Sequence, residues 1–109
     1  MIHGNERADL QIRSVTENDI GTDEVWTTVQ TLFGWLDLQG GDSKYTTYNA
    51  KIQESTHIFL ADYKVLDDRI KAENSRAIIK GYVYDIMLID DPMGKHRQLE
   101  FYLKYTGGQ

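Results

Sequence analysis

Cysteine is absent from the 109 residues, and proline occurs only once. A chain without cysteine has no disulfide framework and no thiolate metal site, which fits a reducing compartment such as the cytosol. No apolar run is long enough for a membrane-spanning helix, and the polar first ten residues lack the apolar core of a secretory signal. The excess of acidic residues, 17 against 12 basic ones, argues against nucleic-acid binding through overall charge. We expect a single domain over residues 1–109, with no membrane partner.

Residue patterns that support catalysis or cofactor binding are also missing. The histidines are far apart and none belongs to an HExxH metal motif. Each acidic pair consists of sequence neighbours, which point to opposite faces of a strand and do not form an acid–base dyad. Neither a GxSxG nucleophile turn nor a glycine-rich phosphate loop occurs. The histidines are His3, His57 and His96, and the acidic pairs are Asp67-Asp68 and Asp90-Asp91. The sequence therefore predicts no catalytic residue, no metal ligand and no cofactor, and we expect a protein that is not an enzyme.

The last third of the chain, 75–105, contains three strand-like runs separated by two turns. Lys80-Gly81 forms the first turn, and residues 91–94 (DPMG) have the order typical of a type I turn. In the final run, apolar residues alternate with polar ones, so one face of a strand is apolar. That face consists of Leu99, Phe101, Leu103 and Tyr105. These runs predict a three-stranded antiparallel meander that needs the front of the chain to cover it.

The front of the chain supplies three more strands. We expect strands over 9–15, 25–38 and 56–64, a polar loop over 17–24, and a helical turn or irregular crossing over 65–74. In the second strand the expected core face is Val25, Thr27, Val29, Thr31, Phe33, Trp35 and Asp37, and Gly34 marks a bulge or bend. Residues 1–7 and 106–109 are expected to be flexible. The fold class is mainly β: a small six-stranded barrel or sandwich.

A long loop, with or without a short helix, is expected between the second and third strands, over 39–54. The segment opens with Gly40-Gly41, and its threonines disfavour a stable helix. Its candidate partner or channel residues are Lys44, Tyr45, Tyr48, Lys51 and Ile52. Lysine neutralises phosphate and tyrosine stacks or packs, so the loop is suited to a phosphate backbone or a partner protein. A solvated loop whose tyrosines fold back on the barrel explains the same residues.

The back half of the chain resembles the head–tail adaptor, or head closure, proteins of tailed bacteriophages. Residues 56–70 (THIFLADYKVLDDRI) resemble the family's third strand and the crossing that follows. Gly81, Tyr84 and Ile86 match a family pattern, and Asp90 with residues 94–103 resembles the closing turn and last strand. The front half agrees more loosely, through 7–13, Trp26 and 35–43. The chain departs from the family at Ala61, where many relatives carry a basic residue before the tyrosine.

The resemblance implies a virion structural protein that forms a ring beneath the portal and joins capsid to tail. Its expected partners are the portal or adaptor ring, tail proteins and further copies of itself, and such proteins are often monomeric before assembly. The resemblance further implies that the loop over 39–54 becomes ordered on assembly. In some relatives this loop narrows the channel and helps to retain packaged DNA, which implies non-specific contact with double-stranded DNA. The expected location is the head–tail interface of the virion, after a stage in the host cytoplasm.

Two alternatives remain open at this point. Another connector or tail-completion protein of the same neck region would use a similar small barrel. A barrel of a different class, which binds oligonucleotides or saccharides as OB-folds do, would need exposed aromatic residues on one strand face. Tyr82, Tyr84 and Tyr102 are the candidates for that face.

Overall fold

The computed structural model describes residues 6–18, 20–38 and 55–108 and shows an almost purely β protein. Two short 3-10 helices, η1 (Ala72–Asn74) and η2 (Pro92–Gly94), interrupt the strands. No helix in the described residues is long and apolar enough to span a membrane. The strands are β1 (Glu6–Asn18), β2 (Gly21–Leu38), β3 (His57–Asp62), β4 (Ser75–Ile79), β5 (Tyr82–Asp90) and β6 (Gln98–Gly108).

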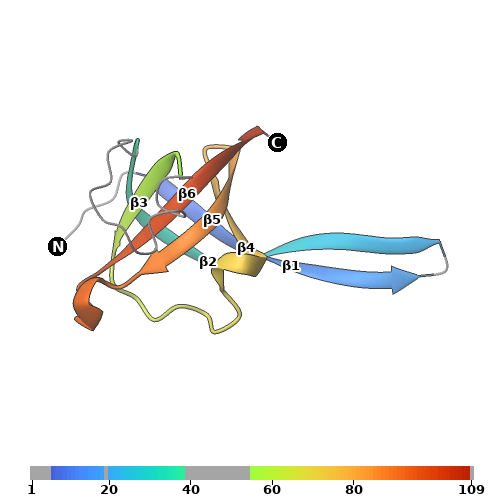
Figure 1. The fold of residues 1–109 in the computed structure, drawn as a ribbon, viewed down its shortest axis with the longest axis horizontal. Coiled ribbons are helices and arrows are strands. Elements are labelled where there is room, and N and C mark those ends of the chain that lie inside the picture. Colours follow the sequence, from blue (N-terminus) through green and yellow to red (C-terminus); the bar gives the residue numbers. More distant parts are fainter. Residues whose placement is uncertain (1–5, 19, 39–54, 109) are drawn as a thin grey trace.

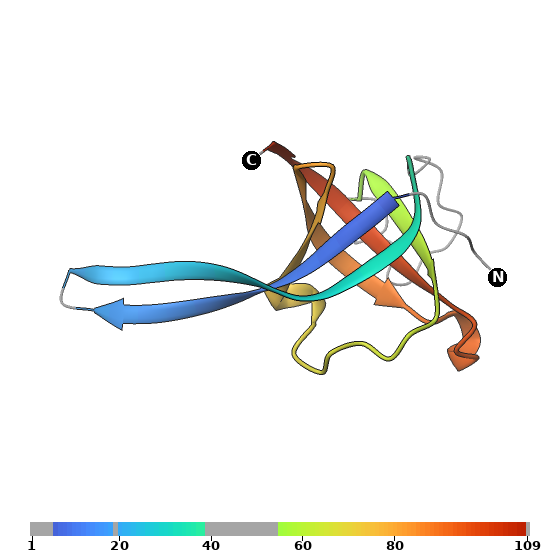
Figure 2. The ribbon, with the colours of Figure 1, turned by 180° about the vertical axis from the view of Figure 1, so that it is seen from behind.

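The six strands form a closed antiparallel barrel in the order β1-β2-β3-β6-β5-β4, with β4 returning to β1 (Figures 1 and 2). Closure between β1 and β4 runs from Asp9↔Ile78 to Ile12↔Ser75. The predicted mainly β class with six strands is therefore confirmed, and the expected crossing before β4 is irregular chain that ends in η1. Closing the sheet satisfies main-chain groups that an open edge would leave unpaired.

The meander β4-β5-β6 forms as predicted, but its second turn differs from the expected type. Lys80 and Gly81 both have positive φ, 55° and 80°, as a two-residue type I′ hairpin turn requires. In the second turn the Gly94 amide donates to the Asp91 carbonyl over 2.8 Å. Met93 has φ 58°, which belongs to the i+2 position of a type II turn, so the type I prediction is wrong. The residue types could not show this, because Pro at i+1 suits both turns.

The core fills the inside of the barrel and confirms the predicted face of β6. Leu99, Phe101 and Leu103 are at most 3% exposed, whereas Tyr105, further along the same face, is 43% exposed at the barrel's end. The phenyl rings of Phe59 and Phe101 lie 6.2 Å apart across the β3–β6 pair. The other buried apolar residues are Ala8, Leu10, Leu32, Ala61, Ile70, Ala77, Ile79, Tyr84 and Ile86.

The predicted core face of β2 is wrong at Phe33 and Trp35, whereas Val29 of that face does pack against the core. Leu32 is buried, and Phe33 and Trp35 are 59% and 45% exposed on the outside. The pairing with β1 shifts between Leu10 and Gln11, whose partners are Gln30 and Thr28, so Val29 is an extra residue in β2. Such a bulge reverses the alternation of faces on its two sides, and apolar residues on both faces concealed it from a period-two pattern. Gly34 is not the bulge.

Gly34 instead permits close contact between β2 and β3. A Cβ atom placed on Gly34 would lie 2.1 Å from the carbonyl oxygen of Leu60 and 2.9 Å from Cζ of Phe59. Glycine is the residue that allows such an approach of two backbones. Ala61, the position where the resemblance implies a basic residue, pairs with Gly34 and is 1% exposed.

Beyond the barrel, β1 and β2 continue as a two-stranded arm (Figures 1 and 2). The pairs run out to Asn18↔Gly21, so the polar loop predicted over 17–24 is the end of a hairpin. Polar and charged residues suit a strand exposed on both faces, and their polarity led to the prediction of a loop. The arm makes the molecule 48 Å long but only 28 and 26 Å across. We call residues 13–18 and 20–27 the arm.

Within the described residues, both chain ends pair with strands of the barrel. Glu6 and Arg7 pair with Gly34 and Phe33 of β2. Residues 107 and 108 pair with Val83 and Tyr82 of β5, and the Thr106 hydroxyl donates to the Val83 carbonyl. These pairs extend the barrel strands into the first and last described residues.

Candidate functional site

The expected partner and channel residues, Lys44, Tyr45, Tyr48, Lys51 and Ile52, lie in 39–54, outside the described residues. The structure does place both ends of that segment. Leu38 at the end of β2 pairs with His57 at the start of β3, so the segment leaves and rejoins the barrel at one point. Both ends of the segment therefore lie at this end of the barrel.

The returning end is fixed to the last strand through Thr56. Its amide donates to the Leu103 carbonyl over 2.7 Å. Its hydroxyl accepts from the Tyr105 amide and lies 2.8 Å from Nδ1 of His57. Ser55 beside it is buried. Since main chain and side chain both contact β6, the junction with 39–54 is a rigid part of the barrel.

Four aromatic side chains line a hollow of about 350 Å³ at the same end: His57, Tyr82, Tyr84 and Tyr105. The ring of Tyr84 lies 5.1 Å from His57 and 5.6 Å from Tyr105, both edge-on. Burial, followed by the neighbouring phenols of Tyr105 and Tyr82, raises the pKa of Tyr84, so this phenol stays protonated near neutral pH. We call these four residues the aromatic hollow.

The tyrosines proposed for an OB-like binding face do not share one surface. Tyr82 and Tyr84 belong to the aromatic hollow, where Tyr84 is 5% exposed. Tyr102 is on the opposite face of β6 and donates to the Glu100 carboxylate over 3.1 Å. His57 and Tyr105 are the other two residues of the aromatic hollow. Their spacing along the sequence did not indicate that they lie beside Tyr82 and Tyr84.

An apolar surface lies on the outside of β2, where Phe33 and Trp35 are about half exposed. Trp35 pairs across the sheet with Leu60, and Leu38 at the strand's end is 73% exposed. Exposed aromatic residues grouped on one strand are typical of contact surfaces. The sequence predicted these residues as core, because a buried and a contact-forming aromatic residue have the same signature. We call Phe33 and Trp35 the outer β2 surface.

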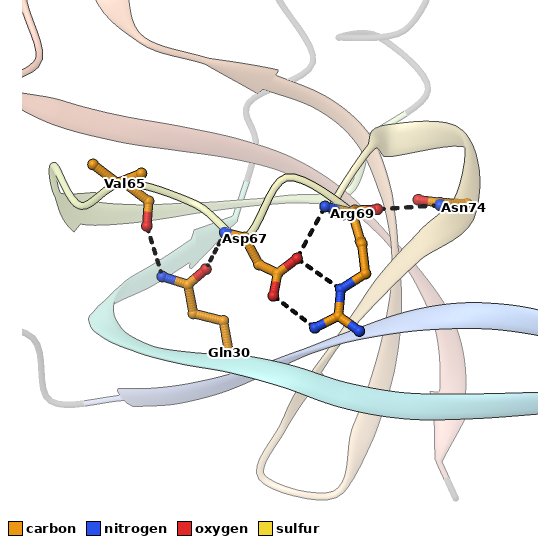
Figure 3. Close-up of polar contacts among 5 residues, drawn as sticks. All are labelled: Gln30, Val65, Asp67, Arg69 and Asn74. Atoms are coloured by element: carbon orange, nitrogen blue, oxygen red, sulfur yellow. Dashed lines mark hydrogen bonds and ion pairs between the residues drawn. The ribbon is translucent and has the colours of Figure 1, made fainter.

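The crossing between β3 and β4 is held to the barrel by polar contacts (Figure 3). The Gln30 side chain donates to the Val65 carbonyl over 3.1 Å and accepts from the Asp67 amide over 2.7 Å. Asp67 accepts from the main-chain amide, Nε and Nη2 of Arg69, at 3.0, 2.9 and 2.7 Å. Asn74 then donates to the Arg69 carbonyl. These bonds give irregular chain a defined path.

The Arg69 guanidinium, followed by the Arg69 amide, lowers the pKa of Asp67 from 3.8 to about 2. A lowered folded-state pKa means that the ionised carboxylate stabilises the fold above pH 3.8, and that this contribution disappears as the pH falls through about 2. We expect Arg69→Gln to return the pKa of Asp67 toward 3.8, measured by carboxyl-carbon NMR titration. Lys71→Gln is the matched control and should leave the pKa low, whereas an equal rise in both variants would contradict the assignment to Arg69.

Both histidines in the described residues contact neighbouring side chains of the fold. His57 belongs to the aromatic hollow, and His96 contacts Asp91 through its amide and Nδ1, at 2.9 and 2.5 Å. The His96 ring also lies 4.5 Å from that of Tyr63. Within 6–18, 20–38 and 55–108, no group of three or more acidic or histidine residues is arranged to hold a metal ion.

No protein-family model and no curated protein matches the chain.

Proposed function

We propose that this protein is a virion structural protein of a tailed bacteriophage. In this proposal it is a head closure component that forms a ring beneath the portal, joins capsid to tail and helps to retain packaged DNA. The observation that carries the proposal is the junction at Leu38↔His57, where residues 39–54 leave and rejoin one end of a closed barrel. A rigid barrel that presents one long connection at one end suits a ring whose connections project together toward a channel.

The outer β2 surface favours the assembly of several copies into a ring. Phe33 and Trp35 lie on a strand that is exposed in the single chain and borders the junction. Burying an aromatic side chain contributes roughly 1.5–3 kcal/mol, so two such residues favour packing against a neighbouring copy. The lysines and tyrosines of 39–54 would then face the channel, where lysine neutralises DNA phosphates. Another neck component, either a connector or a tail-completion protein, is the close alternative.

The aromatic hollow favours a second candidate function, an OB-like barrel that binds oligonucleotides or saccharides. Tyr82 and Tyr105 are 47% and 43% exposed there, so a base or sugar ring can stack on them. A titration of the purified protein with single-stranded DNA at several salt concentrations separates the two functions. Micromolar binding that Tyr105→Ala abolishes would favour the binding barrel, and its absence favours the neck protein.

The decisive experiment replaces residues 43–53 with a glycine–serine linker in the phage that encodes the protein. Because both junction ends are held by main-chain pairing, the isolated variant should keep its thermal unfolding transition. The particles should nevertheless lose DNA or fail to join tails, as measured by DNA content and electron microscopy. A matched replacement of 43–53 that keeps Lys44, Tyr45, Tyr48, Lys51 and Ile52 distinguishes loss of these side chains from general disruption. Fully infectious particles with the shortened loop would contradict the proposal.

A further inference from the structure

The arm has a strand edge without a neighbour. On its outer side β1 pairs with β4 only from Asp9 to Ile12, where the partner is Ser75. Beyond Ile12, no strand in the described residues lies along that side of β1, while its inner side continues to pair with β2. An antiparallel strand with one open side presents main-chain donors and acceptors that can pair with another strand.

The apolar side chains in the outer part of the arm are largely exposed to solvent. At its base, Arg13 contacts Glu24 at 3.3 Å, and the Trp26 ring packs 4.2 Å from the Arg76 guanidinium. Further out, Val15 and Val25 are 55% and 49% exposed and Ile20 is 96% exposed. A two-stranded ribbon exposed on both faces is marginally stable alone, and a third strand on one edge stabilises it.

The open edge is complementary to itself. Residues 13–17 read Arg-Ser-Val-Thr-Glu. If two copies pair antiparallel about Val15, Arg13 of each copy lies opposite Glu17 of the other, and Ser14 lies opposite Thr16. Residues 13, 15 and 17 share one face of the strand, so both charge pairs and the Val15 contact form on the same side. Arg13 and Glu17 are exposed and accessible to a second chain.

We propose that a second copy of this chain pairs with the open edge of β1 over residues 13–17, forming a two-fold dimer through the arms. The other arm edge does not offer this match, because β2 contains no lysine or arginine over 21–38 to oppose its acids. The antiparallel orientation of the two arms follows from the charge at the arm's end. Residues 17–24 contain four acids and no lysine or arginine. Arms pointing the same way would bring these acids together, whereas two-fold pairing directs them apart.

The inference does not depend on the proposed function, because a two-fold contact joins two copies and does not by itself build a ring. It concerns the free protein, for which the resemblance implies a monomer. An edge of five residues is a small interface, so we expect Kd of roughly 10–1000 µM and a reversible dimer at high concentration.

Charge reversal with sedimentation velocity over a concentration series tests the proposal. Arg13→Glu and Glu17→Arg each place like charges opposite each other twice per dimer, and each should weaken dimerisation at least about tenfold. The double variant restores both pairs and should dimerise as the wild type does. An equimolar mixture of the two single variants should form a heterodimer, because the two acids on the edge of one chain then face the two arginines on the edge of the other. Arg7→Glu, a matched reversal on the barrel, should change nothing.

Two outcomes would overturn the proposal. One is a wild type that stays monomeric up to millimolar concentration. The other is a dimer that survives both single reversals and dissociates when Phe33 is replaced by alanine, which would place the contact on the outer β2 surface. Hydrogen exchange gives an independent measurement: amides in 13–17 should gain protection with concentration, while those in 21–27 should not.

Discussion

Replacing Gly34 with alanine should lower the free energy of unfolding by roughly 3 kcal/mol or more, measured by urea denaturation of the isolated protein. The added Cβ would lie 2.1 Å from the Leu60 carbonyl oxygen and 2.9 Å from the Leu60 carbonyl carbon. These are main-chain atoms of a paired strand, so the contact is relieved only if β2 and β3 separate. The pairs from Gly34↔Ala61 to Leu38↔His57 would then weaken together.

The sign of this effect is diagnostic. Gly34 does not have positive φ, unlike Gly21, Gly81, Gly94 and Gly107. In ordinary strand conformation, glycine to alanine stabilises a protein by about 0.4–1 kcal/mol, because the unfolded chain loses freedom. A stabilised variant would therefore contradict the close approach. Phe59→Leu in the same chain removes the Cζ contact but keeps the Leu60 carbonyl, so it should not rescue Gly34→Ala.

Gly34 also connects the fold to the proposed function. The β2–β3 pairs bring the two ends of 39–54 together, and Gly34 is where those pairs begin. The barrel has other pairs that can hold it closed, between β3 and β6 and between β1 and β4. Weakened β2–β3 pairing should therefore affect particle assembly at temperatures where the barrel itself still folds.

Much of the back half could be predicted from the sequence, because the alternation of apolar and polar residues and the turn residues indicate the same three strands. Two turns, at Lys80-Gly81 and at residues 91–94, separate the strands β4, β5 and β6. The apolar face of these strands is the buried one. The turn type at Met93 could not be predicted, since Pro92 at i+1 suits both type I and type II turns, and only the structure shows the positive φ of Met93. Long-range closure of β1 against β4 likewise leaves no local signal in the sequence.

The front half was harder to predict for two physical reasons. An extra residue at Val29 changes which face of β2 is buried, and only the pairing with β1 reveals it. The arm is exposed on both faces, so it lacks the apolar alternation by which strands are recognised. Both errors fall on surfaces that now carry proposals: Phe33 and Trp35 outside β2, and residues 13–17 on the arm. Disagreement between local pattern and structure is expected where residues serve contacts instead of the fold.

Phe101→Ala should lower the free energy of unfolding by roughly 3–5 kcal/mol, and Phe101→Asp should leave the chain unfolded. The Phe101 side chain is 1% exposed, and it packs 6.2 Å from the Phe59 ring at the centre of the barrel. Removing it opens a cavity between β3 and β6, which their paired strands cannot close without distortion. A domain of this size has about 5–15 kcal/mol of total stability, so the truncation removes a large share of it. Thermal or urea unfolding measures the loss.

Phe33→Ala is the matched control, because the same side chain is deleted from the outside of the barrel. Phe33 is 59% exposed, so its removal should change the stability of the isolated chain by about 0.5 kcal/mol or less. The comparison separates the two roles of an aromatic residue in this protein. Equal losses at both positions would mean that Phe33 is core after all, and the bulge at Val29 would be misplaced. A stable Phe33→Ala protein that no longer completes phage heads would instead assign Phe33 to the contact between copies, since only assembly would then require it.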